Sequence, residues 1–297
     1  MDVAGKGKQP NLIFLHIPKS AGTTLNFILE NHFSREESYS VSKSNYYPDG
    51  SIDGFKAMTQ ARQAKIRWLT GHMGYGYHEH LSGPSVYVTL LREPVERLIS
   101  NFYFERHLKE SPIHEMIRSG KMDLREYVYY YYAIEMDNLQ TRMIAGNWEK
   151  RGDGPCTPEM LEQAKQNIQD HFAVVGVARR FDEFYFLLRR YFGWHYVPYV
   201  KRNKTKNRPR REEVPTADRQ MIKEYNQYDI ELFQFAKEMF ETQLAAYSPK
   251  MVQASLMTAA WRNELFKRQL GLQTFSLRQF IREHSVRTYL RQRLHWD

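Results

Sequence analysis

The chain has 297 residues, 42% of them hydrophobic and 14% aromatic, which suits one large domain with a sizeable packed core. Lys and Arg exceed Asp and Glu by 43 − 34 = 9, a surplus that favours anionic partners such as nucleotides, nucleic acid, acidic glycans or lipid headgroups. The single cysteine, Cys156, excludes an intrachain disulfide, and no apolar run is long enough to predict a membrane span.

The N-terminal part of the chain alternates apolar runs with helical patterns. Residues 11–17 read NLIFLHI, which predicts a buried strand, and residues 24–32 continue as a helix. Residues 34–54 are polar, with proline and glycine among them, so we expect a loop there. A helix over 55–67 and a short strand over 68–71 should follow.

Two further buried strands are predicted, over residues 85–91 (SVYVTLL) and 172–177 (FAVVGV). Helical patterns begin at Pro94, a residue favoured in the first turn, and recur over 123–145, 158–170 with Thr157 as N-cap, 181–192 and 216–243. Strands that alternate with helices predict an α/β fold with a central, mostly parallel sheet flanked by helices. We expect one main domain over 1–249 and extra C-terminal helices over 250–297.

The segment HIPKSAGTT, residues 16–24, joins the first strand to the first helix. Backbone amides at such a junction form an anion site, because they point outward and the helix dipole favours negative charge. Lysine adds a mobile positive charge, glycine permits close approach of the backbone, and the threonines add hydroxyls that can cap the helix. The residues predicted to bind phosphate here are Lys19, Ser20, Ala21, Gly22, Thr23 and Thr24.

A nucleotide-dependent kinase is the main alternative enzyme. Its phosphate loop places lysine directly after the second glycine, whereas Lys19 precedes Gly22 and the first glycine is absent. Such enzymes also need an acidic residue at the end of a strand to bind Mg²⁺, but the residue that follows the strand over 85–91 is Arg92. A basic residue there suits a second phosphate, and Ser100, about two turns into the next helix, can add a hydrogen bond.

These two motifs resemble those of sulfotransferases that use 3′-phosphoadenosine 5′-phosphosulfate (PAPS). HIPKSAGTT resembles the 5′-phosphosulfate loop of that family, and the spacing of Arg92 and Ser100 in LREPVERLIS resembles its 3′-phosphate site. The sequences of the two motifs are most similar to those of the glycan enzymes, above all the heparan sulfate 2-O and 6-O group. The segments DNLQTRMIAG and FAVVGVARRFDEF also resemble that group. The resemblance implies a P-loop-kinase-like sulfotransferase fold and a PAPS-dependent sulfotransferase domain over 1–249.

Sulfuryl transfer needs a cation near the leaving oxygen and a base near the acceptor hydroxyl. Lys19 is the candidate cation and His72, in TGHMGYG, the candidate general base. The match to the 2-O enzymes, whose catalytic histidine sits in a similar context, implies the same residue. His78 and His80 are nearby competitors, and His16 is expected to be a buried structural residue.

A basic segment over residues 201–211 reads KRNKTKNRPRR. A charge run is usually a solvated loop, but related sulfotransferases place a segment that closes over the nucleotide at this point of the chain. The resemblance therefore implies donor binding by Asn203, Lys204, Thr205, Lys206 and Arg208. The tyrosine run YVYYYY, residues 127–132, could stack on sugar rings, although helix packing with some exposed hydroxyls is the simpler interpretation.

The predicted reaction transfers a sulfuryl group from PAPS to a hydroxyl of a carbohydrate or glycolipid-like acceptor, without a metal and without a nucleic-acid partner. A homodimer is possible, and the C-terminal helices are expected to pack on the core or pair two subunits. A basic glycan- or nucleic-acid-binding module without turnover is the non-enzyme alternative. The missing disulfides and the polar N-terminus favour a cytoplasmic, bacterial protein, with a truncated Golgi-lumenal domain as the alternative.

Overall fold

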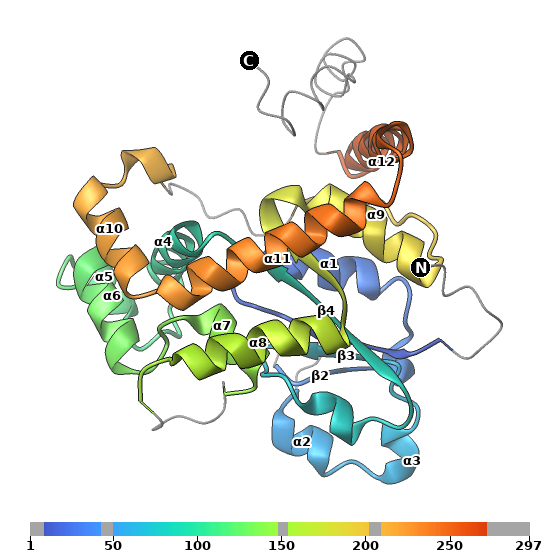
Figure 1. Cartoon of the computed structure of the whole chain (residues 1–297), viewed down its shortest axis with the longest axis horizontal. Coiled ribbons are helices and arrows are strands. Elements are labelled where there is room, and N and C mark those ends of the chain that lie inside the picture. Colours follow the sequence, from blue (N-terminus) through green and yellow to red (C-terminus); the bar gives the residue numbers. More distant parts are fainter. Residues whose placement is uncertain (1–8, 43–49, 148–153, 202–208, 272–297) are drawn as a thin grey trace.

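The computed structural model describes residues 9–42, 50–147, 154–201 and 209–271. One five-stranded sheet has the order β2-β3-β1-β4-β5, and all neighbouring strands are parallel (Figure 1). Its strands are β1 (Asn11–Leu15), β2 (Ser38–Ser40), β3 (Trp68–Gly71), β4 (Ser85–Leu91) and β5 (Phe172–Val177). The predicted α/β fold with a parallel sheet is therefore confirmed.

Both faces of the sheet are covered, which explains why its strands are continuous apolar runs. All five residues of β1 are buried. Alternate side chains of a strand point to opposite faces, so Ile13 and Leu15 belong to one apolar cluster and Leu12 and Phe14 to a second. Helices α7 and α8 pack on the first face, α1 and α9 on the second, and α11 runs beside the edge strand β5 (Figure 1).

The longer helices match the predicted patterns. Pro94 begins α4, and Thr157 caps α8 by accepting a hydrogen bond from the Met160 amide, as predicted. The helices on the two faces of the sheet and the last helix of the described residues are α1 (Gly22–Leu29), α7 (Leu139–Ala145), α8 (Pro158–His171), α9 (Phe181–Phe192), α11 (Gln227–Ala245) and α12 (Pro249–Gln269).

A third apolar cluster lies beside the sheet. It joins α4 (Pro94–Glu105), α5 (His114–Arg118), α6 (Leu124–Ala133) and α10 (Thr216–Glu224). The tyrosine run lies on α6, where Tyr127 and Tyr131 are buried and Tyr129 and Tyr132 are exposed. Tyr127 and Tyr131 pack in this cluster, as the simpler interpretation expected, but Tyr131 also lines the cavity described below, so stacking on a sugar ring stays a prediction.

Three predicted elements differ from the structure. Residues 34–54 are not one loop: they contain the short β2, which exists because it pairs with β3, and the start of α2 (Ile52–Lys56). The helix expected over 55–67 is divided between α2 and α3 (Gln60–Gln63). The helix expected over 123–145 breaks between α6 and α7, where Glu135 and Asn138 take positive φ values of 58° and 46°.

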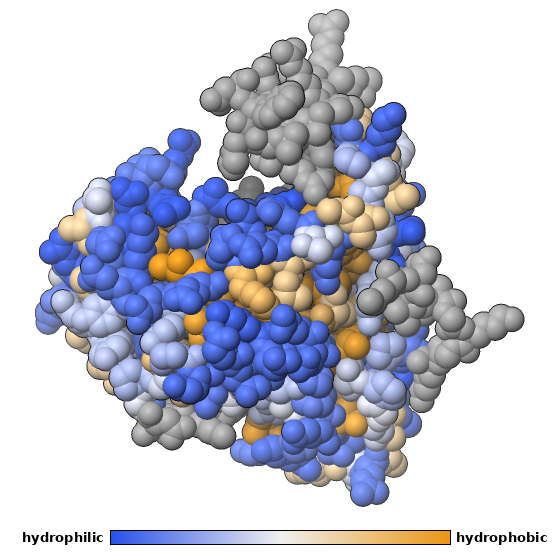
Figure 2. All heavy atoms as spheres, viewed as in Figure 1, coloured by the Kyte–Doolittle hydropathy of each residue, from blue (hydrophilic) through white to orange (hydrophobic). Residues whose placement is uncertain are grey.

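The C-terminal extension begins with α12, which packs on α9 and fully buries Val252. Residues 272–297 lie outside the described residues, and the division of the chain at residue 249 stays a prediction. No helix in the described part of the chain is long and apolar enough to cross a membrane. Figure 2 shows one face of the molecule, on which hydrophilic side chains predominate and apolar ones show between the helices.

Candidate active site

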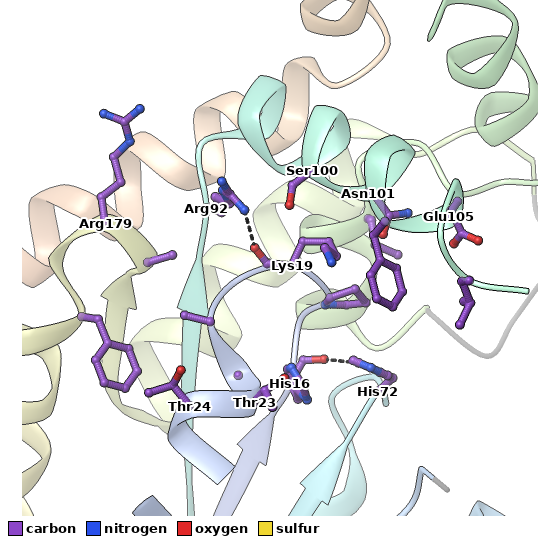
Figure 3. Close-up of a pocket in the computed structure, with 18 of the residues that line it drawn as sticks. His16, Lys19, Thr23, Thr24, His72, Arg92, Ser100, Asn101, Glu105 and Arg179 are labelled. Atoms are coloured by element: carbon purple, nitrogen blue, oxygen red, sulfur yellow. Dashed lines mark hydrogen bonds between the residues drawn. The ribbon is translucent and has the colours of Figure 1, made fainter. Parts of the chain in front are cut away.

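A cavity of about 660 Å³ opens at the carboxyl edge of the sheet (Figure 3). Four of its lining residues directly follow strands: His16 follows β1, His72 follows β3, Arg92 follows β4 and Ala178 follows β5. Since β1 is central and the chain moves from it to both sides, this edge is the topological switch point where open α/β sheets bind ligands.

The cavity brings together most of the residues predicted from the sequence. Those that line it are Lys19, Ala21, Gly22, Thr23, Thr24, His72, Arg92 and Ser100. Ser20 is fully buried next to them, and its Oγ has no hydrogen-bond partner among the described residues. The predicted loop residues Asn203, Lys204, Thr205, Lys206 and Arg208 lie outside the described residues.

The predicted phosphate loop, residues 16–24, has an unusual backbone. Lys19 and Ala21 take positive φ values of 68° and 67°, the left-handed conformation that residues other than glycine seldom adopt. Left-handed residues that alternate with others turn successive amides toward one side and form a concavity suited to an anion. The first turn of α1, which begins at Gly22, adds its amides and the positive end of its dipole.

One detail of this loop was predicted wrongly, and one glycine has an additional structural reason. Thr23 and Thr24 do not cap α1, because the N-cap is Ala21 and it makes no side-chain cap bond. Gly22 is required by a neighbouring side chain, since a Cβ built there would lie 1.9 Å from Cδ2 of His16. The glycine therefore makes room for the His16 ring beside the loop.

Arg92 lies between the end of β4 and the start of α4, where it lines the cavity. Its Nη1 donates to the Lys19 carbonyl oxygen at 2.9 Å, which ties the end of β4 to the phosphate loop (Figure 3). Its Nε also lies 3.7 Å from Oε2 of Glu96, which is buried and also paired with Arg179. Ser100, on the next turns of the same helix, is buried and faces the cavity.

A buried glutamine fixes the backbone of Arg92, and the sequence analysis missed it. The Arg92 amide donates to Oε1 of Gln140 at 2.9 Å, and Nε2 of Gln140 donates back to the Arg92 carbonyl at 3.0 Å. Gln140 is fully buried at the start of α7. The only signal in the sequence was that the segment DNLQTRMIAG, which contains Gln140, resembles the heparan sulfate 2-O and 6-O enzymes. That resemblance gave its residues no role.

A buried carboxylate supports this glutamine in turn. Asp229 of α11 accepts hydrogen bonds from the Gln140 amide at 3.2 Å and from the Thr141 amide at 2.8 Å. Nε of Arg97 lies 4.0 Å from Oδ2 of Asp229, so these two fully buried side chains form an ion pair. Burial raises the pKa of Asp229, while the charge of Arg97 and the amide donors oppose that shift.

Lys19 lies against an aromatic ring on the cavity wall. Its Nζ is 3.6 Å from the ring centroid of Phe104, a residue that lines the cavity from α4. A cation over a ring face is stabilised by the ring quadrupole, so Phe104 helps to hold the ammonium group inside the cavity. Neither Phe104 nor its neighbour Glu105, which also lines the cavity, was predicted from the sequence.

The His72 ring has a defined orientation. Its Nδ1 lies 2.7 Å from the His16 carbonyl oxygen, so Nδ1 carries the hydrogen and Nε2 is left as the basic nitrogen (Figure 3). The His72 amide donates to Oγ of Ser42 at 2.8 Å. Although His72 is an exposed residue, the atoms packed around its ring lower its pKa by desolvation; the charge of Lys19 lowers it further, and the bond to the His16 carbonyl opposes the shift.

The other histidines are arranged differently from what the sequence indicated. His16 is half-buried and lines the cavity, with its ring centroid 4.4 Å from that of His72, so it is part of the site instead of the buried core. Burial, His72 and Lys19 together lower its pKa well below the usual value. His78 instead contacts the Tyr87 hydroxyl at 3.0 Å, and neither His78 nor His80 lines the cavity.

Comparison with known families agrees with this geometry. A family model described as "Sulfotransferase family" matches residues 6–236, which include every strand and the whole described cavity. The chain belongs to the sulfotransferase family. The match favours sulfuryl transfer over the kinase alternative, and it agrees with the resemblance found in the phosphate motifs.

Three curated sulfotransferases illustrate the relationship. The chain is 24% identical to a heparan sulfate 2-O-sulfotransferase of Caenorhabditis elegans, over 60% of this chain and 58% of that protein. It is 24% identical to human heparan-sulfate 6-O-sulfotransferase 3, over 77% and 57% of the two chains. It is 26% identical to bovine galactose-3-O-sulfotransferase 3, over 82% and 60%. The sulfotransferase chain therefore spans less than two thirds of the length of these relatives.

Three other expectations stay predictions. The relatives named here come from animals, so they give no support to a bacterial, cytoplasmic protein, which stays a prediction. Within the described residues, no group of three or more His, Cys, Asp or Glu side chains is arranged to hold a metal. Metal independence and a homodimer also stay predictions.

Proposed function

We propose that this sulfotransferase moves a sulfuryl group from PAPS to a hydroxyl of a carbohydrate acceptor, with His72 as general base and Lys19 as the cation at the leaving oxygen. One observation carries the proposal. A single cavity joins an anion-binding loop, a second basic position at Arg92 and the basic nitrogen of an oriented histidine. The relatives act, by name, on heparan sulfate and galactose, which supports a carbohydrate acceptor.

The residues on the β1 side of the cavity fit a phosphosulfate group. The loop from Lys19 to Ala21 and the first turn of α1 offer amides, hydroxyls and positive charge to its oxygens. The buried Oγ of Ser20 has no partner among the described residues, and a bound phosphate oxygen would supply one. A volume of about 660 Å³ lies within the range of cavities that hold nucleotide-sized ligands.

The residues on the β4 side fit a second phosphate. Arginine binds phosphate through two parallel hydrogen bonds, and Arg92 points along the cavity wall with Ser100 beside it. Its tie to the Lys19 carbonyl sets its distance from the phosphate loop. Two more cations line the cavity and can serve the donor: Arg179, which the sequence did not indicate, and Lys201, the first residue of the predicted basic segment.

PAPS, when bound, supplies an electrophilic sulfur whose bond to a phosphate oxygen is broken in the transfer. Nε2 of His72 takes the proton of the acceptor hydroxyl as the acceptor oxygen bonds to sulfur. The lowered pKa of His72 keeps its ring neutral, and so able to accept a proton, at neutral pH. Nζ of Lys19 stabilises the negative charge that develops on the departing phosphate oxygen.

The test is a screen of hydroxyl acceptors with radiolabelled PAPS, in EDTA, followed by product analysis. We expect label to appear on a carbohydrate and not on protein or nucleic acid. Binding of 3′,5′-adenosine bisphosphate should be tighter than binding of AMP, because only the former has the second phosphate. Equal affinity for both nucleotides, or turnover of ATP with Mg²⁺ in place of PAPS, would refute the proposal.

A further inference from the structure

A second cavity, of about 310 Å³, lies between α9 and α12. Its lining includes Arg189 of α9, Arg262 of α12 and Tyr196 from the segment after α9. It shares no lining residue with the cavity that holds Lys19 and His72. The proposed chemistry gives this second cavity no role.

Two guanidinium groups are held over one aromatic ring in this cavity. The Cζ atoms of Arg189 and Arg262 lie 5.3 Å and 5.8 Å from the ring centroid of Tyr196. The ring is fixed, since the Tyr196 hydroxyl donates to Oδ1 of Asn263 at 2.7 Å. Two cations that start on different helices are thus brought to the same place.

Among the described residues, no carboxylate balances these two charges. No Asp or Glu side chain of this part of the chain forms an ion pair with Arg189 or Arg262. Nε of Arg189 donates to the Trp194 carbonyl at 3.3 Å. Burial lowers the pKa of Arg189, and repulsion from Arg262 and Arg190 adds to that effect. A bound anion would relieve this repulsion.

The opposite wall leaves room for a ligand. Helix α12 contributes only small side chains beside Arg262, namely Ala254, Ser255, Thr258 and Ala259. These positions lie on one face of the helix, because residues three and four apart are neighbours there. Small side chains keep the space over the guanidinium groups open, and two hydroxyls line it.

We propose that this cavity binds an oxyanion group, a sulfate or carboxylate, carried by an acidic oligosaccharide. The arginines and the missing carboxylate point to the oxyanion, and the oligosaccharide carrier rests on the proposed carbohydrate acceptor. Helix α9 connects the two cavities, since Phe181 lines the first and Arg189 the second. The two positions are 189 − 181 = 8 residues apart, which is about 12 Å along the helix axis.

The test measures binding of a sulfated disaccharide by calorimetry at low salt, with the active-site cavity saturated by 3′,5′-adenosine bisphosphate. Arg262→Gln should weaken binding about three- to tenfold, because it removes one charge-assisted contact at a partly exposed site. Arg268→Gln removes the same charge from the same helix outside the cavity and should leave affinity within about twofold. Equal weakening by both variants would overturn the site.

A second pair of variants tests whether the charge is unbalanced. Ser255→Glu places a carboxylate in the cavity, so it should raise the melting temperature and abolish disaccharide binding, relative to Ser255→Gln of similar size. A lower melting temperature for Ser255→Glu than for Ser255→Gln would show that the arginines need no anion. That outcome would overturn the proposal.

Three further ligands separate the possible carriers. A neutral disaccharide should bind no better to the unmodified protein than to Arg262→Gln. Inorganic sulfate that binds as tightly as the disaccharide, or vesicles of anionic lipid that lose binding in Arg262→Gln, would overturn the oligosaccharide carrier. Because these measurements need no turnover, they stay readable even if no carbohydrate accepts a sulfuryl group from PAPS.

Discussion

Substitution of Gln140 by methionine, which has a similar length, tests whether this glutamine positions Arg92. The change removes the two hydrogen bonds between its side-chain amide and the Arg92 backbone, at 2.9 Å and 3.0 Å. Each such bond contributes about 1 kcal/mol net, and a buried peptide group left without a partner costs about 1–3 kcal/mol. We therefore expect the free energy of unfolding to fall by about 2–4 kcal/mol.

The functional effect should be separate from the loss of stability. A displaced Arg92 loses part of a charge-assisted contact with the 3′-phosphate, and the whole contact is worth about 1.5–3 kcal/mol. The affinity for 3′,5′-adenosine bisphosphate should fall about tenfold, while the affinity for AMP changes little. Calorimetry with both nucleotides, well below the melting temperature, measures this ratio.

Asn167→Leu is the matched control. Asn167 of α8 is buried, and its Nδ2 donates to the Ile144 carbonyl at 2.8 Å. Ile144 lies on α7, as Gln140 does, but this hydrogen bond does not involve Arg92. It should lower the melting temperature without changing the nucleotide preference. If Gln140→Met destabilises the protein as Asn167→Leu does and keeps the full preference for the bisphosphate, then Gln140 is structural only and the reasoning is wrong.

Other changes test the remaining features. His72→Ala should lower kcat about 10²–10⁴-fold with unchanged nucleotide affinity, whereas His78→Ala should not; a fully active His72→Ala enzyme would assign the base elsewhere. A general base must be unprotonated, and the pKa of His72 is lowered from the ordinary histidine value of 6.5, so kcat/KM should decline only as the pH falls below 6.5. An activity already lost at pH 7 would contradict this. The pKa of His32 in the folded protein is lowered to about 4, chiefly by burial and then by His195 and Arg189. As the pH falls, His32 is therefore protonated in the unfolded chain before it is protonated in the folded protein. Stability should therefore fall as the pH drops from 6.5 toward 4, and His32→Phe should flatten that slope in thermal unfolding; equal slopes would exclude His32 as the cause. Saturating 3′,5′-adenosine bisphosphate should protect residues 201–211 from trypsin, and unchanged cleavage would remove this segment from the donor site.

Local sequence patterns were sufficient for the framework of the sheet. The apolar runs at β1, β4 and β5 predict buried strands because a strand covered on both faces has no polar face to show. The loop over residues 16–24 could be singled out for a similar reason, because its residue types lie together in the chain, and its binding of phosphate stays a prediction. The short β2 was missed, since its Ser-Tyr-Ser sequence has no apolar pattern and forms a strand only by pairing with β3.

The chemistry of the site depends on contacts between residues far apart in the chain. The sequence alone indicated Lys19, His72 and Arg92 as functional residues. It could not indicate that the carbonyl of His16 sets the tautomer of His72, 56 residues away, or that Gln140 fixes the backbone of Arg92, 48 residues away. A residue pattern reports the local period and burial of a segment, whereas a hydrogen-bond partner depends on which strand ends the sheet topology places side by side. Only the tertiary structure decided those partners.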